Sequence, residues 1–283
     1  MSIKLVQDRL DSYNCKSSID EDHAIREITQ EVALAALGRT DFFKHAAFQG
    51  GTCLRIFYGL NRFSEDMDFI LKEANRDFAL QPHLQAVCDE LKAYGYDVEV
   101  ADRSRTDVAV RKAFLKDDSL GKDLQLQYAD KSGPLKKIRI RFEVDTNPPS
   151  GSGVEIKYVD FPFVSSVTVQ DKPSLFAGKL HALLCRGYVK GRDWYDFLWY
   201  TSQDIGINYE FLSSALKQQG PWQNEDIEVD LKWCLEHLGN KVRSVDWGAA
   251  REDVRRFVKA TEQPSLGLWS KELFLSQVGK IRR

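Results

Sequence analysis

The spacing of apolar positions predicts that helices and strands alternate from the start of the chain. Residues 19–38 carry apolar side chains at helical intervals behind an acidic first turn, and residues 81–93 repeat that spacing. Between them, residues 46–49 and 65–72 fit short strands, and residues 52–60 fit a helix. This order favours an α/β class of fold.

Alternation of apolar and polar residues predicts further strands in the middle of the chain. They are expected at residues 98–100, 109–110, 124–126, 138–145 and 164–169. The prolines and glycines of residues 147–153 cannot continue a ladder of strand hydrogen bonds, so a loop is expected there. Together the strands predict one mixed sheet.

Beyond residue 170 the pattern becomes mainly helical. Helices are expected at residues 174–186, 193–200, 209–218, 227–238, 247–260 and 271–278. We therefore predict two domains, residues 1–170 containing the sheet and residues 171–283 mainly helical. All six tryptophans follow residue 190, and most are expected in the core of the helical domain.

Composition and charge narrow the possible functions only slightly. The 283 residues include 40 basic and 42 acidic side chains, and a net charge of −2 gives no global attraction to nucleic acid. No run of roughly 18 apolar residues occurs, so we expect a cytoplasmic protein without a membrane partner. The five cysteines contain no Cys-x-x-Cys pair, which indicates neither a disulfide framework nor a zinc site.

A glycine pair precedes the first candidate helix of the sheet domain. In Gly50-Gly51-Thr52, backbone amides can approach a phosphate without interference from a Cβ atom, and the helix N-terminus adds its positive dipole. The Thr52 hydroxyl can donate a further hydrogen bond. A tight turn between a strand and a helix would use the same residues, so this motif alone does not decide the function.

Two aspartates follow on alternate positions of the next predicted strand. In Glu65-Asp66-Met67-Asp68 the two aspartates point to the same face, because successive strand residues face opposite sides. Two such carboxylates can bind Mg²⁺ and leave coordination positions for phosphate oxygens and water. An acidic surface strand is the alternative, but aspartate is rare in surface strands.

A third carboxylate is available on the strand predicted at residues 138–145. Strand parity puts Arg139, Arg141, Glu143 and Asp145 on one face, and the apolar residues on the other. In two-metal nucleotidyl transfer, a third acid completes the metal site and helps to deprotonate the attacking hydroxyl. Either acid could serve, and a cross-strand ion pair with a neighbouring lysine is the alternative.

Charged residues at the start of the helical domain form the last candidate cluster. Lys179 can bind a phosphate as a point charge, and Arg192 can offer a bidentate fork. Asp193 and Asp196 are three residues apart and share a helical face. A structural explanation is equally open, with Arg192 and Asp196 as an ion pair and Asp193 as a helix N-cap.

Taken together, these motifs resemble the AbiEii/AbiGii-type toxin nucleotidyltransferases. That family, within the DNA polymerase β-like superfamily, supplies the toxins of type IV toxin–antitoxin and abortive-infection systems. It couples a Gly-Gly-Ser/Thr turn to an Arg-Phe-Ser-Glu-Asp-x-Asp-Phe strand, then a strand carboxylate, a helix lysine and Arg-Asp-x-x-Asp. The chain matches this order from residue 48 to residue 196.

The resemblance implies a polymerase β-like core, completed by the helical domain, that transfers a nucleoside monophosphate from a nucleoside triphosphate. It implies two Mg²⁺ ions as cofactors, a cognate antitoxin, growth arrest and, as for some members, the 3′ end of tRNA as acceptor. The implied catalytic residues are Asp66, Asp68, Glu143, Lys179 and Asp196, of which Asp66, Asp68 and Glu143 bind metal. The implied nucleotide- and phosphate-binding residues are Gly50, Gly51, Thr52, Arg62, Ser64, Lys179, Arg192 and Asp193.

Two alternatives remain open at this point. The acceptor could be a protein or a small molecule, although local basic residues hint at RNA, namely Arg103, Arg105, Lys112, Lys136, Lys137, Arg139 and Arg141. The chain could also be a non-catalytic regulatory protein on the same fold, but loss of the metal-binding aspartates would be expected in that case.

Overall fold

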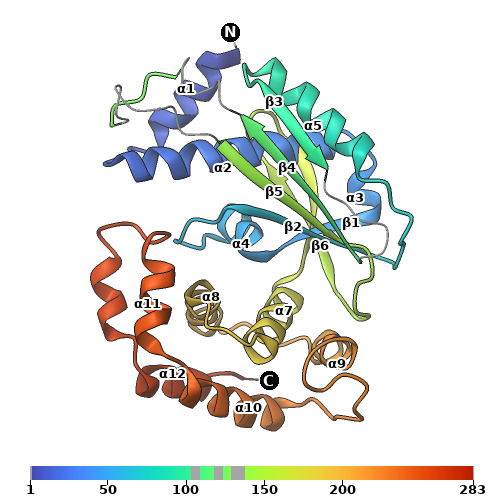
Figure 1. The fold of residues 1–283 in the computed structure, drawn as a ribbon, viewed down its shortest axis with the longest axis vertical. Coiled ribbons are helices and arrows are strands. Elements are labelled where there is room, and N and C mark those ends of the chain that lie inside the picture. Colours follow the sequence, from blue (N-terminus) through green and yellow to red (C-terminus); the bar gives the residue numbers. More distant parts are fainter. Residues whose placement is uncertain (1, 103–108, 118–123, 129–137, 283) are drawn as a thin grey trace. The chain divides into compact units, whose positions relative to one another are not determined.

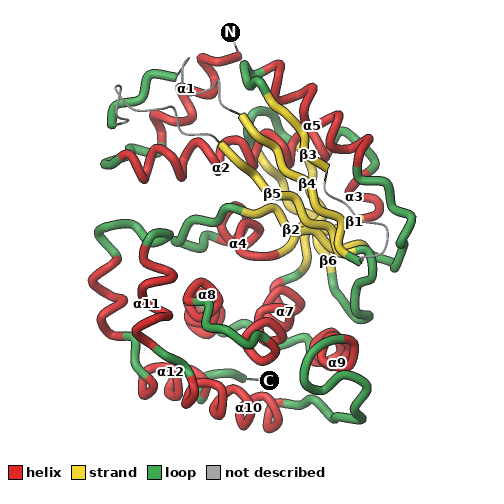
Figure 2. The backbone as a smooth tube through the Cα atoms, viewed as in Figure 1, coloured by secondary structure: helices red, strands yellow, loops and turns green. Residues whose placement is uncertain are grey.

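The computed structural model describes residues 2–102, 109–117, 124–128 and 138–282. The chain divides into two compact units. We call them the sheet unit, Met1–Gly59, Phe63–Pro148 and Ile156–Val169, and the helical unit, Leu60–Arg62, Pro149–Glu155 and Gln170–Arg283. Figure 2 shows that the strands gather in the first and that the second is mainly helical.

The sheet unit is built on a mixed sheet whose described strands follow the order β3-β4-β5-β2-β1-β7-β6 (Figure 1). The strands are β1 Ala46–Gln49, β2 Asp66–Leu71, β3 Val98–Asp102, β4 Val110–Asp117, β5 Ile138–Asp145, β6 Val154–Val159 and β7 Ser165–Gln170. The helices are α1 Ser2–Ser12, α2 Ser18–Gly38, α3 Phe42–His45, α4 Gly50–Tyr58 and α5 Gln81–Ala93. Strand β2 runs parallel to β5 and antiparallel to β1. The predicted α/β fold with a mixed sheet is confirmed.

The core of the sheet unit is a group of aromatic side chains. Phe69 on β2 contacts Phe42, Phe48 and Phe142, with ring centroids 5.0, 5.1 and 6.1 Å away. All four side chains are essentially inaccessible to solvent. Burying this apolar face of β2 and β5 turns the alternate, polar residues of both strands to the other face.

The helical unit contains seven described helical segments. They are α7 Lys172–Cys185, α8 Gly191–Ser202, α9 Tyr209–Gln218, α10 Leu231–Ser244, α11 Trp247–Arg255, the 3₁₀ helix η1 Gln263–Leu268 and α12 Lys271–Val278. Side-chain N-caps begin five of them, for example Asp171 before α7 and Asn208 before α9. Trp194 and Phe274 pack at its centre, with ring centroids 5.3 Å apart.

Some predicted elements differ from the structure. Residues 124–126 form no strand, whereas α1 and β6 were not predicted at all. Strand β4 extends over Val110–Asp117, far beyond the two residues expected at 109–110. Within the described residues, no helix is long and apolar enough to cross a membrane.

Close packing of α8 against α11 makes a prediction about Gly191. A Cβ atom at this position would lie 1.8 Å from the backbone oxygen of Ala250 and 3.1 Å from the nitrogen of Val254. Since neither backbone atom can move alone, Gly191→Ala should lower the free energy of unfolding by about 1–3 kcal/mol, measured by urea denaturation.

Gly267→Ala is the matched control, because nothing lies within 4 Å of its added Cβ. It should unfold at the same urea concentration as the parent. Equal stability of the Gly191 variant and this control would show that the contact between α8 and α11 is looser than described.

Candidate functional site

Strand β2 carries the predicted aspartates on one face. Asp66 and Asp68 are half-buried, while Met67 and Phe69 between and after them are buried. The alternation expected from the sequence is therefore confirmed. Neither carboxylate enters the apolar core.

Strand β5 lies beside β2 and brings a third acid to the same place. The parallel register sets Asp68 opposite Glu143 and Asp66 opposite Arg141. Asp145 lies opposite Ile70, two residues farther along the strand, and its Oδ1 accepts a hydrogen bond from the backbone nitrogen of Asn147. This register favours Glu143 over Asp145 as the acid next to Asp68.

Two cations lie among these acids. The Arg141 guanidinium is 3.6 Å from Asp66 Oδ1 and 3.5 Å from Glu143 Oε1. Lys112, opposite Glu143 on β4, places its Nζ 3.1 Å from the same Oε1 atom. The cross-strand ion pair with a lysine, considered as the alternative for Glu143, is thus present. These cations offset the repulsion between carboxylates held on neighbouring strand positions.

The Gly-Gly-Thr turn lies directly against β2. Gly50 has a φ of +79°, and a Cβ atom there would lie 2.7 Å from Asp68 Oδ2. Only glycine meets both conditions without strain. Thr52 is buried, and its hydroxyl donates a hydrogen bond to the Asp66 carbonyl oxygen. This contact ties α4 to β2 and favours a positioning role for Thr52 over the predicted phosphate contact.

The acids fit Mg²⁺ by their chemistry. Among the residues that the structure describes, no three Asp, Glu, His or Cys side chains converge as a ready metal cage. Mg²⁺ uses only one or two protein carboxylates, however, and completes its shell with phosphate oxygens and water. Glu143 Oε1 is buried and contacts the two cations without a well-directed hydrogen bond, so it has capacity for a further ligand.

The helical unit holds a second cluster, formed by buried ion pairs. Lys179 on α7 places its Nζ 2.8 Å from both Asp193 Oδ1 and Asp196 Oδ2. Arg62 donates two hydrogen bonds of 2.6 Å to the two oxygens of Asp196, which is fully buried. The structure thus joins Arg62 to Asp196, whereas the sequence analysis assigned Arg62 to phosphate. Burial alone would lower the pKa of Lys179, but the two aspartates raise it.

Arg186 belongs to the same cluster, although the sequence analysis did not select it. Its Nη1 lies 3.2 Å from Asp193 Oδ2, whereas Lys179 contacts the other oxygen, Oδ1. Arg186 follows Lys179 by seven residues, or about two helical turns, which is the signal that could have identified it. Burial would raise the pKa of Asp193, but Lys179, Arg186 and Lys190 lower it to about 2.

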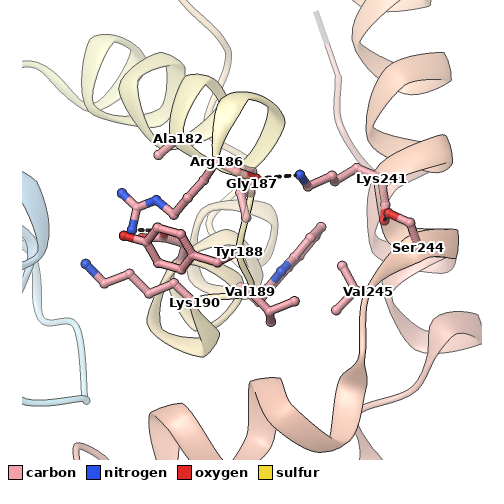
Figure 3. Close-up of a pocket in the computed structure, with 12 residues that line it drawn as sticks. Ala182, Arg186, Gly187, Tyr188, Val189, Lys190, Lys241, Ser244 and Val245 are labelled. Carbon is pink, nitrogen blue, oxygen red and sulfur yellow. Dashed lines mark hydrogen bonds and ion pairs between the residues drawn. The ribbon is translucent and has the colours of Figure 1, made fainter. Parts of the chain in front are cut away.

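A pocket of about 110 Å³ opens between the end of α7 and α10 (Figure 3). Arg186, Tyr188 and Lys190 extend on one side of it, and Lys241 on α10 donates a hydrogen bond to the Arg186 carbonyl oxygen. Burial lowers the pKa of Lys190, and the nearby Asp193 opposes that shift. The pocket is smaller than the cavities that usually hold a nucleotide-sized ligand.

The remaining predicted residues lie outside both clusters or outside the described ranges. Arg192 stacks over the Phe257 ring at 4.2 Å, and its backbone nitrogen donates to Asp253. The carbonyl oxygen of Ser64 accepts a hydrogen bond from Gln30. Of the basic residues that hinted at RNA, Lys112, Arg139 and Arg141 are exposed on β4 and β5. Arg103, Arg105, Lys136 and Lys137 lie outside the described residues.

The buried ion pairs predict how stability depends on pH. The pKa of about 2 for Asp193 lies below its ordinary 3.8, so the ionised form stabilises the fold. That contribution is fully present above about pH 4 and is lost as the pH falls through about 2. Asp193→Asn should lower the free energy of unfolding at pH 7 by about 3 kcal/mol. The Tm of this variant, measured by circular dichroism, should also fall less steeply than that of the parent as the pH decreases from about 4 to about 2.

Asp226→Asn supplies the control, because Asp226 is fully exposed. Its Tm should follow that of the parent at every pH. If the Asp193 variant had the same Tm as the parent at pH 7 and the same fall of Tm at acidic pH, the ion pairs would not stabilise the helical unit.

Comparison with known proteins found similar solved structures and one matching family model. The chain aligns with JHP933 from Helicobacter pylori at 17% identity over 93% of this chain and 90% of that one, with a TM-score of 0.52. MenT4, a nucleotidyltransferase toxin from Mycobacterium tuberculosis, aligns over 100% of both chains at 16% identity, with a TM-score of 0.48. No curated protein sequence gives a significant match.

The likeness to JHP933 supports the fold, and the family rests on the sequence. A family model described as nucleotidyl transferase AbiEii toxin, type IV toxin–antitoxin system, matches residues 32–273. Because this match covers most of the chain and includes both clusters, the protein belongs to the AbiEii family of nucleotidyltransferase toxins.

Proposed function

We propose that this nucleotidyltransferase moves a nucleoside monophosphate from a nucleoside triphosphate to the 3′ end of tRNA in a Mg²⁺-dependent reaction. The observation that carries the proposal is the register of β2 with β5, which sets Glu143 beside Asp68 and leaves Asp66 on the same face. Three oxygen donors on one face of a sheet suit the hard cations that accompany a triphosphate.

The reaction forms one bond and breaks one. An acceptor hydroxyl attacks the α-phosphorus, the bond to the bridging oxygen of the β-phosphate breaks, and pyrophosphate leaves. Asp66, Asp68 and Glu143 would hold two Mg²⁺ ions, which supply charge stabilisation for the phosphoryl oxygens. In this proposal Glu143 would also accept the proton of the attacking hydroxyl. Gly50 and Gly51 offer backbone amides at the N-terminus of α4 to the phosphates.

The helical unit contributes positive charge in this proposal. Lys179 is held by two aspartates, so its ammonium has a fixed position and remains charged across the physiological pH range. Arg186 and Lys190 add two further cations around Asp193. We assign Asp196 a positioning role toward Lys179 and Arg62, because its carboxylate is fully buried between them.

An RNA acceptor is favoured by the basic residues beside the carboxylates. Lys112 and Arg141 are about half exposed and lie within ion-pair distance of the acids. Arg139 extends over the Phe114 ring at 4.1 Å, two residues before Arg141. A polyanion that approaches the acidic face therefore meets cations first. Since the family consists of toxins of type IV systems, we further propose growth arrest in the cytoplasm and a cognate antitoxin.

The carboxylates provide the direct test of the chemistry. Asp68→Asn and Glu143→Gln should each reduce transfer of labelled nucleotide to total RNA by roughly 100-fold or more, because each removes a charged oxygen donor from the developing phosphoryl charge. Transfer is measured with each labelled triphosphate, in Mg²⁺ and in EDTA. The parent should be inactive in EDTA.

Asp145→Asn is the matched control on the same strand, where the carboxylate pairs with Asn147 instead. It should retain most of the parent's activity. If the Asp145 variant lost activity and the Glu143 variant kept it, Glu143 would not be the third carboxylate. Label that enters protein or a small molecule, with none in RNA, would replace the proposed acceptor.

A further inference from the structure

The segment of residues 186–190 joins α7 to α8 and carries an exposed aromatic ring between two cations. Tyr188 is 68% exposed, and Arg186 and Lys190 stand two positions before and after it. Figure 3 shows these three side chains extending to the same side of the segment, away from Lys241. A single exposed tyrosine is common on soluble proteins, so the significance of Tyr188 depends on its neighbours.

Tyr188 belongs to a stack that begins at a buried carboxylate. The Arg186 guanidinium lies over the Tyr188 ring, 5.2 Å from its centroid, and Nη1 of the same guanidinium is 3.2 Å from Oδ2 of buried Asp193. This cation–π contact covers one face of the ring and fixes its orientation. Because most of the tyrosine surface remains accessible, a second planar group can stack on the ring from the solvent side.

The backbone on both sides of Tyr188 is fixed by hydrogen bonds. Lys241 on α10 donates a hydrogen bond of 2.8 Å to the Arg186 carbonyl oxygen. The Asp193 backbone nitrogen donates one of 3.0 Å to the Lys190 carbonyl oxygen. A ring on a segment that is held at both ends loses little conformational freedom when a ligand binds. The segment is therefore suited to ligand binding without first becoming ordered.

Positive charge is in excess beside this ring. In the part of the chain that the structure describes, Asp193 is the carboxylate that attracts the Lys190 ammonium. The cations that repel this ammonium are Arg192, Arg186 and Lys179. A group placed next to Lys190 thus meets more positive than negative charge, which favours an anion. A ligand of this surface is expected to be both planar and strongly anionic.

A nucleoside triphosphate combines these two properties in one molecule. Its base is a flat ring that can stack on tyrosine, and its negative charge is concentrated on adjacent phosphates. Single-stranded RNA also stacks on aromatic rings, but its phosphates are spread along the strand and are bound by a groove of cations that follows them. The cations here, Lys179, Arg186 and Lys190, instead converge on Asp193. This concentration of charge favours the triphosphate over RNA.

We propose that Tyr188 stacks on the base of the nucleoside triphosphate while Lys190 attracts its phosphates. From the proposed function, this role requires only that a nucleoside triphosphate is the substrate. Stacking accepts every base, because each has a π-face, so Tyr188 contributes affinity and not base identity. Loss of the ring should then weaken the binding of every nucleoside triphosphate to a similar extent.

Isothermal titration calorimetry in Mg²⁺, without acceptor, separates the contribution of the base from that of the phosphates. The two ligands are a non-hydrolysable nucleoside triphosphate and inorganic triphosphate, which has no base. Tyr188→Ala should bind the nucleoside triphosphate about 10-fold or more weakly than the parent, and inorganic triphosphate equally well. Tyr188→Phe keeps the ring and should bind both ligands like the parent. Lys190→Gln should weaken both.

Tyr158→Ala is the matched control, because Tyr158 is also 68% exposed but lies on β6. It should bind both ligands like the parent, and melting curves of all variants check that the fold is intact. In the transfer assay, Tyr188→Ala should raise the KM for the triphosphate and retain kcat, because stacking is equal in the ground state and the transition state.

The outcomes distinguish this role of Tyr188 from the function as a whole. A parent that binds no nucleoside triphosphate would refute both. If the parent binds it and Tyr188→Ala binds it equally well, only the stacking role is wrong. Weaker binding of RNA by Tyr188→Ala, with unchanged triphosphate binding, would also overturn the proposal and make the ring a contact for an RNA base.

Discussion

The parallel pairing of β2 with β5 is the constraint on which the acidic face depends. Buried Met67, Phe69 and Phe142 hold the register, because a shift by one residue would turn the acids into the aromatic core. The same pairing brings Asp68 and Glu143 to neighbouring positions, where two carboxylates repel each other. Cations from β4 and β5 offset that repulsion here. In the proposed function, a metal ion and its phosphate ligands would take the place of a protein cation at this face.

A different constraint governs the helical unit. Charges that leave water carry a large desolvation cost, which is recovered only with close partners and well-directed hydrogen bonds. Arg62 and Asp196 meet this condition through a bidentate pair, and Lys179 bridges Asp196 to Asp193. Arg62 precedes β2 by only a few residues, yet it belongs to the helical unit. The motif around the first aspartates thus contains residues that serve two separate clusters.

Much of this organisation could be predicted from sequence, because strand parity and helical spacing are local properties. Alternation located β2 and β5 and turned their acids to one face, and the apolar spacing of α9 and α12 gave their bounds. The partner of a charged side chain can lie far away in the sequence, and local patterns do not identify it. The sequence therefore did not predict the hydrogen bonds from Arg62 to Asp196, 134 residues later, or the contact of Arg186 with Asp193. Strand β6 escaped notice because its apolar residues are exposed, and the loop before it drew attention instead.

The central claim is that the face formed by β2 and β5 binds a divalent metal together with a triphosphate. Mn²⁺ takes the same oxygen ligands as Mg²⁺ and is visible by electron paramagnetic resonance, so its binding can be measured without any acceptor. With a non-hydrolysable triphosphate, the parent should bind Mn²⁺ and the double variant Asp66→Asn/Asp68→Asn should not, while both keep the same melting temperature. Equal Mn²⁺ binding by the two proteins would contradict the account.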